Sequence, residues 1–282
     1  MDNKNVGIDI GGTKMQMLAI FNGQYFERTV PTGITAKKEY IKAEIFKFIN
    51  SLPFEVESIG IAMPGLVEDD NYLIVSDVQP NLDGVTAEYF SDGKYNVKFI
   101  NDVKAAVLTE AANYKDASTI AVLMVGTGIA LGVYSNNKLF TGAKGFAGEV
   151  GFAHIPYRDG IEKFDNLSSG RAILEKAKAS PKELIAKINS GCKKSINIVK
   201  EAGYYFGLLL ALVIQFYNPD VIVVGGTTKT YPFYMEEALK IVKEATLEQS
   251  YEAVKIKEPQ DPKNIVAKWA LLYDLNDLSK LL

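Results

Sequence analysis

Two short turns, rich in glycine and threonine, are the first candidates for chemistry in this sequence. Gly11-Gly12-Thr13 and Gly126-Thr127-Gly128 each lie between two runs that alternate apolar and polar residues. Glycine leaves the backbone N–H groups of a turn unobstructed, so that these groups and the threonine hydroxyl can bind a phosphate. One such turn is weak evidence, because ordinary hairpins use the same residues. Two of them at equivalent places in a repeated unit favour a pair of hairpins that grip one polyphosphate.

Neither turn fits the common nucleotide-binding motifs. The stretch from Gly7 to Lys14 has nearly the spacing of a P-loop, but Thr13 stands where that motif needs lysine, and a strand follows rather than a helix. The second turn begins like GxGxxG, but Leu131 replaces the last glycine and again a strand follows. The Walker and Rossmann motifs are therefore excluded.

Carboxylates stand beside two predicted strand ends. Asp9 precedes the first turn in a strand that we expect to be buried, where an unpaired carboxylate is unfavourable. Either a metal-bound nucleotide or the N–H groups of the turn itself would satisfy it. Asn101-Asp102 ends another strand and opens a helix. This pair is either a helix N-cap or, in a cleft, the site of a general base.

The elements that position these residues form a repeat. Asn22-Gly23 and Asn136-Asn137 each close a further hairpin, because both turn positions need φ > 0. Helical or strand periodicity follows each hairpin unit. The predicted helices cover residues 37–50, 103–111, 172–178, 182–189, 194–217 and 262–275, and the predicted further strands cover 58–63, 97–100 and 221–224. We expect two α/β domains of related topology, residues 1–116 completed by a C-terminal helix over 262–282, and residues 117–261.

Composition excludes several classes of protein. The 282 residues carry a net charge of −3, which disfavours nucleic acid or an anionic membrane as a partner. The single cysteine, Cys192, and the single histidine, His154, cannot form an internal disulfide or a four-ligand N/S zinc site. The most apolar run, 204–216, is shorter than the roughly 20 residues that span a bilayer, and no leader segment is evident. We expect a cytoplasmic protein.

Several motifs together resemble the ROK family of repressors, open reading frames and sugar kinases. They are DIGGTK (9–14), MPGLV (63–67), IND (100–102), VGTGIALGV (125–133), NKLFTGAKGFAGEVG (137–151), SSG (168–170) and NPDVIVVGG (218–226). They occur in the family's order and cover most of the chain. The resemblance implies two actin-like (RNase H-like) α/β domains with a nucleotide and sugar cleft between them.

The resemblance also implies roles for individual residues. Asp102 would be the general base, and Asp9 would order Mg²⁺. The residues expected to bind ATP are Asp9, Gly11, Gly12, Thr13, Lys14, Gly126, Thr127, Gly128, Gly225 and Gly226, the last two against the adenosine. The residues expected to bind sugar hydroxyls are Gly65, Asn81, Asn101, Asp102, Glu149 and Asp165.

The sequence departs from the family pattern after EVG. Phe152 stands where the family has a histidine that serves both sugar and zinc, and the CxCGxxGC loop is missing. We therefore expect no zinc. A phenyl ring offers no hydrogen bond to a sugar hydroxyl, so we expect an N-acetylhexosamine or another substituted hexose to be a better substrate than glucose. In the alternative, Phe152 packs into the core and His154 or Asp165 takes over the sugar contact.

These observations predict an ATP-dependent hexose kinase that forms a homodimer and acts on a small-molecule sugar. The long helix 194–217 is apolar on more than one face, which suits the core or a subunit contact. The alternative is a non-catalytic, sugar-sensing member of the family. Its DNA-binding members carry a helix-turn-helix segment before the first hairpin, and here that hairpin begins at Val6, so we expect no such segment.

Overall fold

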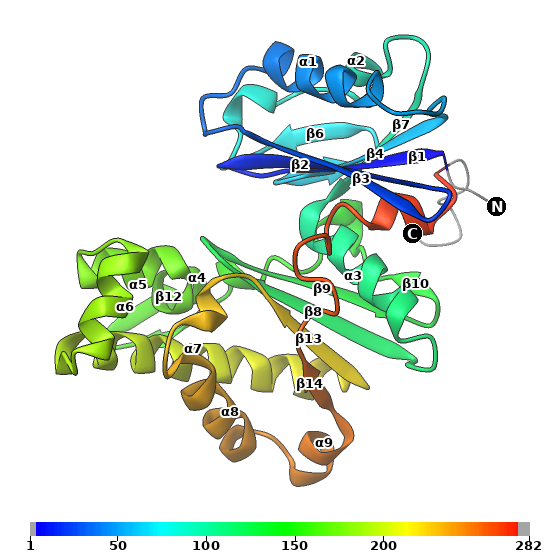
Figure 1. The fold of residues 1–282 in the computed structure, drawn as a ribbon. Helices are drawn as coiled ribbons and strands as arrows, with labels where there is room; N and C mark the ends of the chain where they lie inside the picture. Colours follow the sequence, from blue (N-terminus) through cyan, green and yellow to red (C-terminus); the bar gives the residue numbers. More distant parts are fainter. Residues whose placement is uncertain (1–3, 276–282) are drawn as a thin grey trace. The chain divides into compact units, whose positions relative to one another are not determined.

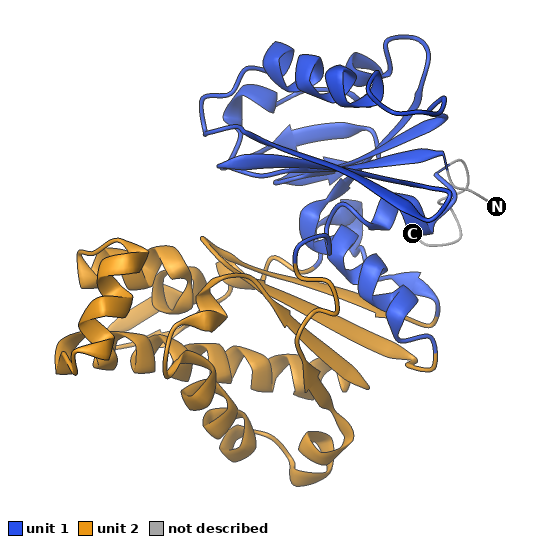
Figure 2. Ribbon diagram, in the orientation of Figure 1, with its two compact units in different colours: residues 1–115, 137–147, 263–282 blue, residues 116–136, 148–262 orange. Residues whose placement is uncertain are grey.

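The computed structural model describes residues 4–275 of the chain. Contacts divide the chain into two compact units (Figure 2). The first contains residues 1–115, 137–147 and 263–282, and the second contains residues 116–136 and 148–262. Residues 137–147, which the predicted boundary assigns to the second domain, have contacts that group them with the first unit.

The first unit is built on a five-stranded sheet with the order β3-β2-β1-β4-β7. Its strands are β1 (Asn5–Ile10), β2 (Lys14–Phe21), β3 (Gln24–Pro31), β4 (Ser58–Met63) and β7 (Asn96–Asn101). The first three are antiparallel, and β4 and β7 run parallel to β1. Asn22 and Gly23 close the β2–β3 hairpin with φ of 50° and 73°, which confirms the predicted turn.

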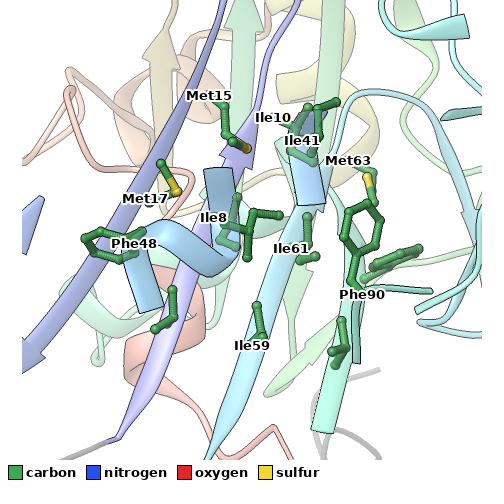
Figure 3. Close-up of a cluster of buried hydrophobic side chains, with 14 of the residues drawn as sticks. Ile8, Ile10, Met15, Met17, Ile41, Phe48, Ile59, Ile61, Met63 and Phe90 are labelled. Atoms are coloured by element: carbon green, nitrogen blue, oxygen red, sulfur yellow. The ribbon is translucent and has the colours of Figure 1, made fainter. Parts of the chain in front are cut away.

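Helices cover both faces of this sheet (Figure 1). On one face, α1 (Lys38–Ile49) and α2 (Ala87–Ser91) bury Ile41, Phe48 and Phe90 against the strand residues, as Figure 3 shows. On the other face lie α3 (Asp102–Asn113) and α10 (Trp269–Leu272). A small ribbon of β5 (Leu66–Glu68) and β6 (Tyr72–Val75) precedes the short 3₁₀ turn η1 (Pro80–Leu82).

The predicted helix over 262–275 is wrong in extent, because only α10 is helical. Residues before α10 form turns that pack closely against the sheet. An added Cβ on Gly7 would lie 1.9 Å from the carbonyl oxygen of Ala267, and the Asn264 side chain accepts a hydrogen bond from Gln16. These contacts hold the segment in a conformation that a continuous helix would not allow. Residues 276–282, part of the predicted terminal helix, lie outside the described residues.

The second unit repeats the strand order of the first. Its sheet has the order β10-β9-β8-β13-β14, with β8 antiparallel to β9 and β13 parallel to both β8 and β14. The strands from this unit are β8 (Thr119–Val125), β9 (Ile129–Ser135), β13 (Val221–Gly225) and β14 (Lys255–Lys257). The sheet also includes the short strand β10 (Lys138–Leu139), although contacts group residues 137–147 with the first unit. The two mixed α/β sheets of related topology confirm the predicted fold class, while the cleft between the units stays a prediction.

The helices of the second unit follow the predicted spacing, with additions that the sequence analysis missed. They are α4 (Phe164–Ser168), α5 (Gly170–Ala177), α6 (Pro181–Asn189), α7 (Lys193–Tyr217), α8 (Tyr234–Ala245) and α9 (Glu248–Ala253). The missed elements include α8 and the β11 (His154–Tyr157) and β12 (Gly160–Lys163) hairpin.

The helix α7 has 25 residues and a mean hydropathy of 1.4 in its most apolar window, so by length and composition it could cross a membrane. The helix is longer than its most apolar run, 204–216, which by itself is too short to span a bilayer. Half of the window is buried inside the unit, where Phe206, Leu210 and Ile214 pack in the core. A core helix of a soluble protein has the same composition.

Candidate functional site

The first glycine turn is closed by one backbone hydrogen bond. The N–H of Gly11 donates to the carbonyl oxygen of Lys14 at 2.9 Å. Thr13 and Lys14 are exposed, and the N–H groups of Gly12 and Thr13 have no hydrogen-bond partner among residues 4–275. Unpaired, accessible N–H groups in a turn are suited to binding an anion such as phosphate.

Two donors from distant segments fix the carbonyl of this turn. The Gly11 carbonyl oxygen accepts from Thr32 Oγ1 at 2.7 Å and from Gln79 Nε2 at 3.0 Å. The Gly11 carbonyl and the Gly12 N–H belong to one planar trans peptide, so the two groups point in opposite directions. Holding the carbonyl therefore aims the Gly12 N–H away from the Thr32 and Gln79 donors. Neither Thr32 nor Gln79 was identified from sequence.

The second turn repeats this arrangement. The N–H of Gly126 donates to the Gly128 carbonyl at 2.9 Å, and the Gly126 carbonyl accepts from the N–H of Gly170 at 2.7 Å and from Thr228 Oγ1 at 3.0 Å. By the same peptide geometry, the Thr127 N–H points away from these donors. Within the described part of the chain, the N–H groups of Thr127 and Gly128 have no partner.

Two glycines, Gly170 at the start of α5 and Gly226 after β13, allow this close packing. An added Cβ on Gly170 would lie 2.5 Å from Thr228 Oγ1 and 2.8 Å from the Gly126 carbonyl oxygen. Gly226 has a φ of 92°, and its added Cβ would lie 2.2 Å from the Val125 carbonyl oxygen. The role expected for Gly225 and Gly226 against adenosine stays a prediction. The structure gives Gly226 a second role in packing beneath the turn.

Asp9 lies at the base of the first turn and has an unusual environment. Its carboxylate accepts no hydrogen bond from any described residue, so the prediction that its own turn satisfies it is not supported. The pKa of Asp9 is raised to about 7, first by burial and then by the negative charge of Asp102, while the positive charge of Lys14 acts in the opposite direction. A divalent cation would remove both unfavourable effects, so this residue fits a metal-bound nucleotide.

The sequence left open whether the Asn101-Asp102 pair is a helix N-cap or contains a general base, and in the structure Asn101 alone is the N-cap. Asn101 is the N-cap of α3, and its side-chain oxygen accepts from the N–H groups of Val103 and Lys104. Asp102 is the first residue of the helix, and one carboxylate oxygen accepts from the Val103 N–H at 2.8 Å. Capping therefore does not require Asp102 as the cap residue.

The other predicted sugar residues of the first unit have the following contacts. The Asn101 amide nitrogen donates to the Gly65 carbonyl at 3.0 Å, which brings these two residues together. Asn81, in η1, is exposed and donates to the Ala36 carbonyl at 3.3 Å.

In the second unit, Asp165 lies against the glycine turn. Asp165 accepts from the Ile129 N–H at 2.7 Å, and burial raises its pKa, while this hydrogen bond and the charges of Arg171 and Lys163 lower it. This contact supports the base of the turn. Glu149 lies exposed in the loop before η3 (Val150–Phe152).

Phe152 does not pack in the core. It is 53% exposed, and the ammonium group of Lys163 lies 4.1 Å from its ring centroid. The alternative in which Phe152 fills the core is therefore wrong. His154 is also exposed, in β11.

Among residues 4–275, no group of three histidine, cysteine, aspartate or glutamate side chains is arranged to hold a metal ion. A cation at Asp9 would therefore need oxygen ligands from a bound phosphate or from water.

Comparison with known proteins gives sugar kinases and repressors alike. The chain is 28% identical to an N-acetyl-D-glucosamine kinase of Haemophilus influenzae, over 83% of this chain and 86% of that protein. It is 26% identical to a xylose repressor of Caldicellulosiruptor bescii, over 87% of this chain and 70% of the repressor. The fold is similar to that of a ROK family glucokinase from Streptomyces griseus in complex with glucose and AMPPNP, with a TM-score of 0.75 and 20% identity over 95% of this chain and 97% of that one.

The model of the ROK family matches residues 5–264, a range that includes both glycine turns, Asp9, Asp102 and the strands that carry them. With the repeated sheet order and the two turns described above, this match establishes that the chain belongs to the ROK family.

Proposed function

We propose that the chain is an ATP-dependent sugar kinase that transfers the γ-phosphoryl group to the primary hydroxyl of a hexose or N-acetylhexosamine. The observation that carries the proposal is the pair of glycine turns, each with its first carbonyl held by two donors and its next N–H groups unpaired. Phosphoryl transfer needs positioning and charge neutralisation from the protein more than covalent chemistry. Two turns with free N–H groups supply that kind of contact.

Two carboxylates of the first unit, Asp102 and Asp9, are proposed to have different roles in the reaction. Asp102 is proposed to accept the proton of the attacking hydroxyl, since Asn101 already serves as the N-cap. Asp9 is proposed to hold Mg²⁺, because its unpaired carboxylate has a raised pKa that a cation would lower. Mg²⁺, when bound, neutralises phosphate charge. Lys14 adds a positive charge close to Asp9.

The residues proposed to bind the sugar are Gly65, Asn81, Asn101, Asp102, Glu149 and Asp165. We favour an N-acetylhexosamine, because exposed Phe152 cannot donate a hydrogen bond to a hydroxyl. The similarity to an N-acetyl-D-glucosamine kinase supports this choice. Asp165 is the weakest member of the set, because one of its oxygens already accepts from Ile129.

A second candidate function is a sugar-sensing protein without catalysis. The similarity to a xylose repressor over 87% of this chain favours it. The retained Asp9, Asp102 and both glycine turns favour the kinase instead, because a sensor of sugar alone needs no phosphate contacts.

We further propose that the protein works in the cytoplasm as a homodimer. Exposed apolar side chains on α7, such as Tyr204, Leu212 and Phe216, offer a surface that a second copy could cover.

A coupled ADP-release assay across glucose, mannose, fructose, N-acetylmannosamine and N-acetylglucosamine tests the proposal. We expect sugar-dependent ADP release, with an N-acetylhexosamine giving the highest kcat/KM. Sugar binding without ADP release would favour the sensor. A clear preference for glucose would contradict the argument from Phe152 while leaving the kinase intact.

A further inference from the structure

Gln79 is a fully buried side chain that joins two segments of the first unit. Its amide nitrogen donates to the carbonyl oxygens of Gly11 and Gly33, both at 3.0 Å. These two acceptors fix which end of the amide faces them, because the amide oxygen would repel both carbonyls. The amide oxygen, Oε1, has no hydrogen-bond partner among the described residues.

The segment around Gln79 is anchored at several points. Ser76 Oγ accepts from the Gln79 N–H at 2.9 Å and donates to the carbonyl of Pro64, the neighbour of Gly65. A Cβ added to Gly12 would lie 2.7 Å from a Val78 methyl group. The segment 76–79 therefore packs directly against the first glycine turn.

The same segment continues into the proposed sugar site. Asn81 follows Gln79 by two residues and donates to the Ala36 carbonyl at 3.3 Å. The loop that Asn81 contacts is the loop that Gln79 contacts at Gly33. A shift of Asn81 on sugar binding would thus reach Gln79 through both the backbone and this loop.

We propose that Gln79 is a positioning residue that couples sugar binding to the first glycine turn. The inference rests on the proposed function, since it needs a sugar at Asn81 and a phosphate at Gly12. Gln79 holds the Gly11 carbonyl and so sets the direction of the Gly12 N–H in the same peptide. Ordering of residues 76–81 by the sugar would tighten this bridge and prepare the turn for phosphate.

The unpaired Oε1 is consistent with this role. A buried carbonyl without a donor is unfavourable. Any donor that a bound sugar brings within reach of Oε1 would strengthen the bridge, because the nitrogen end of the amide is already engaged. A donor at Oε1 would therefore complete the hydrogen bonding of the Gln79 amide.

The first test measures the coupling between the two ligands. The dissociation constant of N-acetylglucosamine, or of the best sugar from the assay above, is measured with and without saturating AMPPNP. In the native chain we expect each ligand to tighten the other by about 5- to 150-fold, the usual range for coupled sites. In Gln79→Met, which keeps the length but lacks the donor, we expect this factor to fall below about 3-fold. Gln24→Met, an exposed glutamine of the same unit, should keep the native factor.

The second test begins with the native chain, so its first result does not depend on the folding of a variant. Hydrogen exchange of residues 11–15 is followed in the native chain with sugar and no nucleotide, and we expect exchange to slow at least severalfold. In Gln79→Met this slowing should disappear, and kcat should fall more than the KM for sugar rises.

Native coupling in a folded Gln79→Met variant would overturn the inference, as would unchanged exchange of residues 11–15 when sugar binds the native chain. A chain that releases ADP but shows no such coupling refutes only this inference. A chain that shows the coupling without ADP release refutes only the proposed kinase activity. A chain that binds no sugar refutes both.

Discussion

In each of the two glycine turns, hydrogen-bond donors hold the carbonyl of the first glycine, but the two turns use different donors. Each holds the carbonyl of its first glycine with two donors, one of which is a threonine hydroxyl, Thr32 in the first unit and Thr228 in the second. The second donor differs. It is the side chain of Gln79 in the first unit and the backbone N–H of Gly170, the first residue of α5, in the second.

This difference separates an adjustable turn from a rigid one. A backbone donor at the start of a helix cannot change its direction without moving the helix, and here the packing leaves no room for a Cβ. A glutamine side chain has rotatable bonds and responds to the segment that carries it. The first turn can therefore be tuned by ligands and by changes to the Gln79 side chain, whereas the second is held by the backbone of Gly170, which tolerates no added Cβ.

The carboxylates beside the two turns, Asp9 and Asp165, also differ in their hydrogen bonds. Asp165 accepts from a backbone N–H of its turn, whereas Asp9 accepts no hydrogen bond from the described residues. Asp165 therefore supports structure, and Asp9 remains available to a cation.

The largest effect is expected from Asp102→Asn in the first unit. Removal of a general base usually lowers the rate by about 10²- to 10⁴-fold, so sugar-dependent ADP release should fall by that factor. The fold should be nearly unchanged, because Asn101 keeps the helix cap, and sugar binding should be nearly unchanged, because an asparagine at 102 can still hydrogen-bond a hydroxyl. Circular dichroism and calorimetry check these points, with Asp116→Asn, an exposed residue, as control. Turnover near that of the native chain would leave Asp102 with only a local structural role.

A loss of stability is expected from Gly170→Ala in the second unit. The new methyl group would overlap Thr228 Oγ1 and the Gly126 carbonyl, and overpacking of this kind costs about 1–3 kcal/mol. We expect a lower Tm and a higher KM for ATP with little change in the dissociation constant for sugar. Gly160→Ala is the matched control, because a Cβ there meets no atom within 4 Å. Equal stability of the two variants would contradict the rigidity of this turn.

The raised pKa of Asp9 predicts a pH dependence of stability. The folded chain binds this proton more tightly than the unfolded chain, since the pKa rises from 3.8 to about 7 on folding. The stabilisation is therefore complete below about pH 3.8 and is lost as the pH rises through 7. In thermal unfolding without Mg²⁺, the Tm of the native chain should fall relative to that of Asp9→Asn between pH 5 and about 8.

Asp220→Asn provides the control of opposite sign. Hydrogen bonds from Thr119 and Ser118 lower the pKa of Asp220, so its contribution is lost as the pH falls below the ordinary range. A native Tm that runs parallel to that of Asp9→Asn at every pH would mean that Asp9 ionises normally.

The smallest effects are expected from Thr32→Val and Thr228→Val, which remove one hydrogen bond from each turn. One such bond contributes about 0.5–1.5 kcal/mol, so each variant should raise the KM for ATP by about two- to tenfold. The double variant should show the product of the two effects, because the threonines lie in separate units. Thr32→Val with Gln79→Met should not be additive, since both donors serve the Gly11 carbonyl. Additivity in the second pair would argue against a shared role.

The sequence predicted local features well and distant contacts poorly. Strand alternation, the Asn22-Gly23 turn and the helical spacing of α1, α5, α6 and α7 depend on neighbouring residues, and the structure confirms them. Thr228 and Gln79 reach their turns across 102 and 68 residues. No local pattern marks such residues, because a threonine or glutamine in a loop has no periodicity.

Where the structure differs from what the sequence suggested, tertiary contacts explain the difference. The segment after Pro262 has helical spacing, but the close approach of Ala267 to Gly7 and the Gln16–Asn264 hydrogen bond hold most of it in turns. The alternative that placed Phe152 in the core followed from its apolar character, yet its contact with Lys163 lies at the surface. In both cases tertiary contacts override the local preference.

The close packing of Ala267 against Gly7 also has a consequence for synthesis on the ribosome. Residues 263–275 pack with a unit whose first strand leaves the exit tunnel more than two hundred residues earlier. Although α3 already lies on one face of the sheet of the first unit, part of that face therefore stays uncovered until residues 263–275 emerge. Apart from an excursion at 137–147, the second unit is contiguous and can complete its core sooner. Nascent chains of this protein should reverse the usual order in which the N-terminal domain folds first.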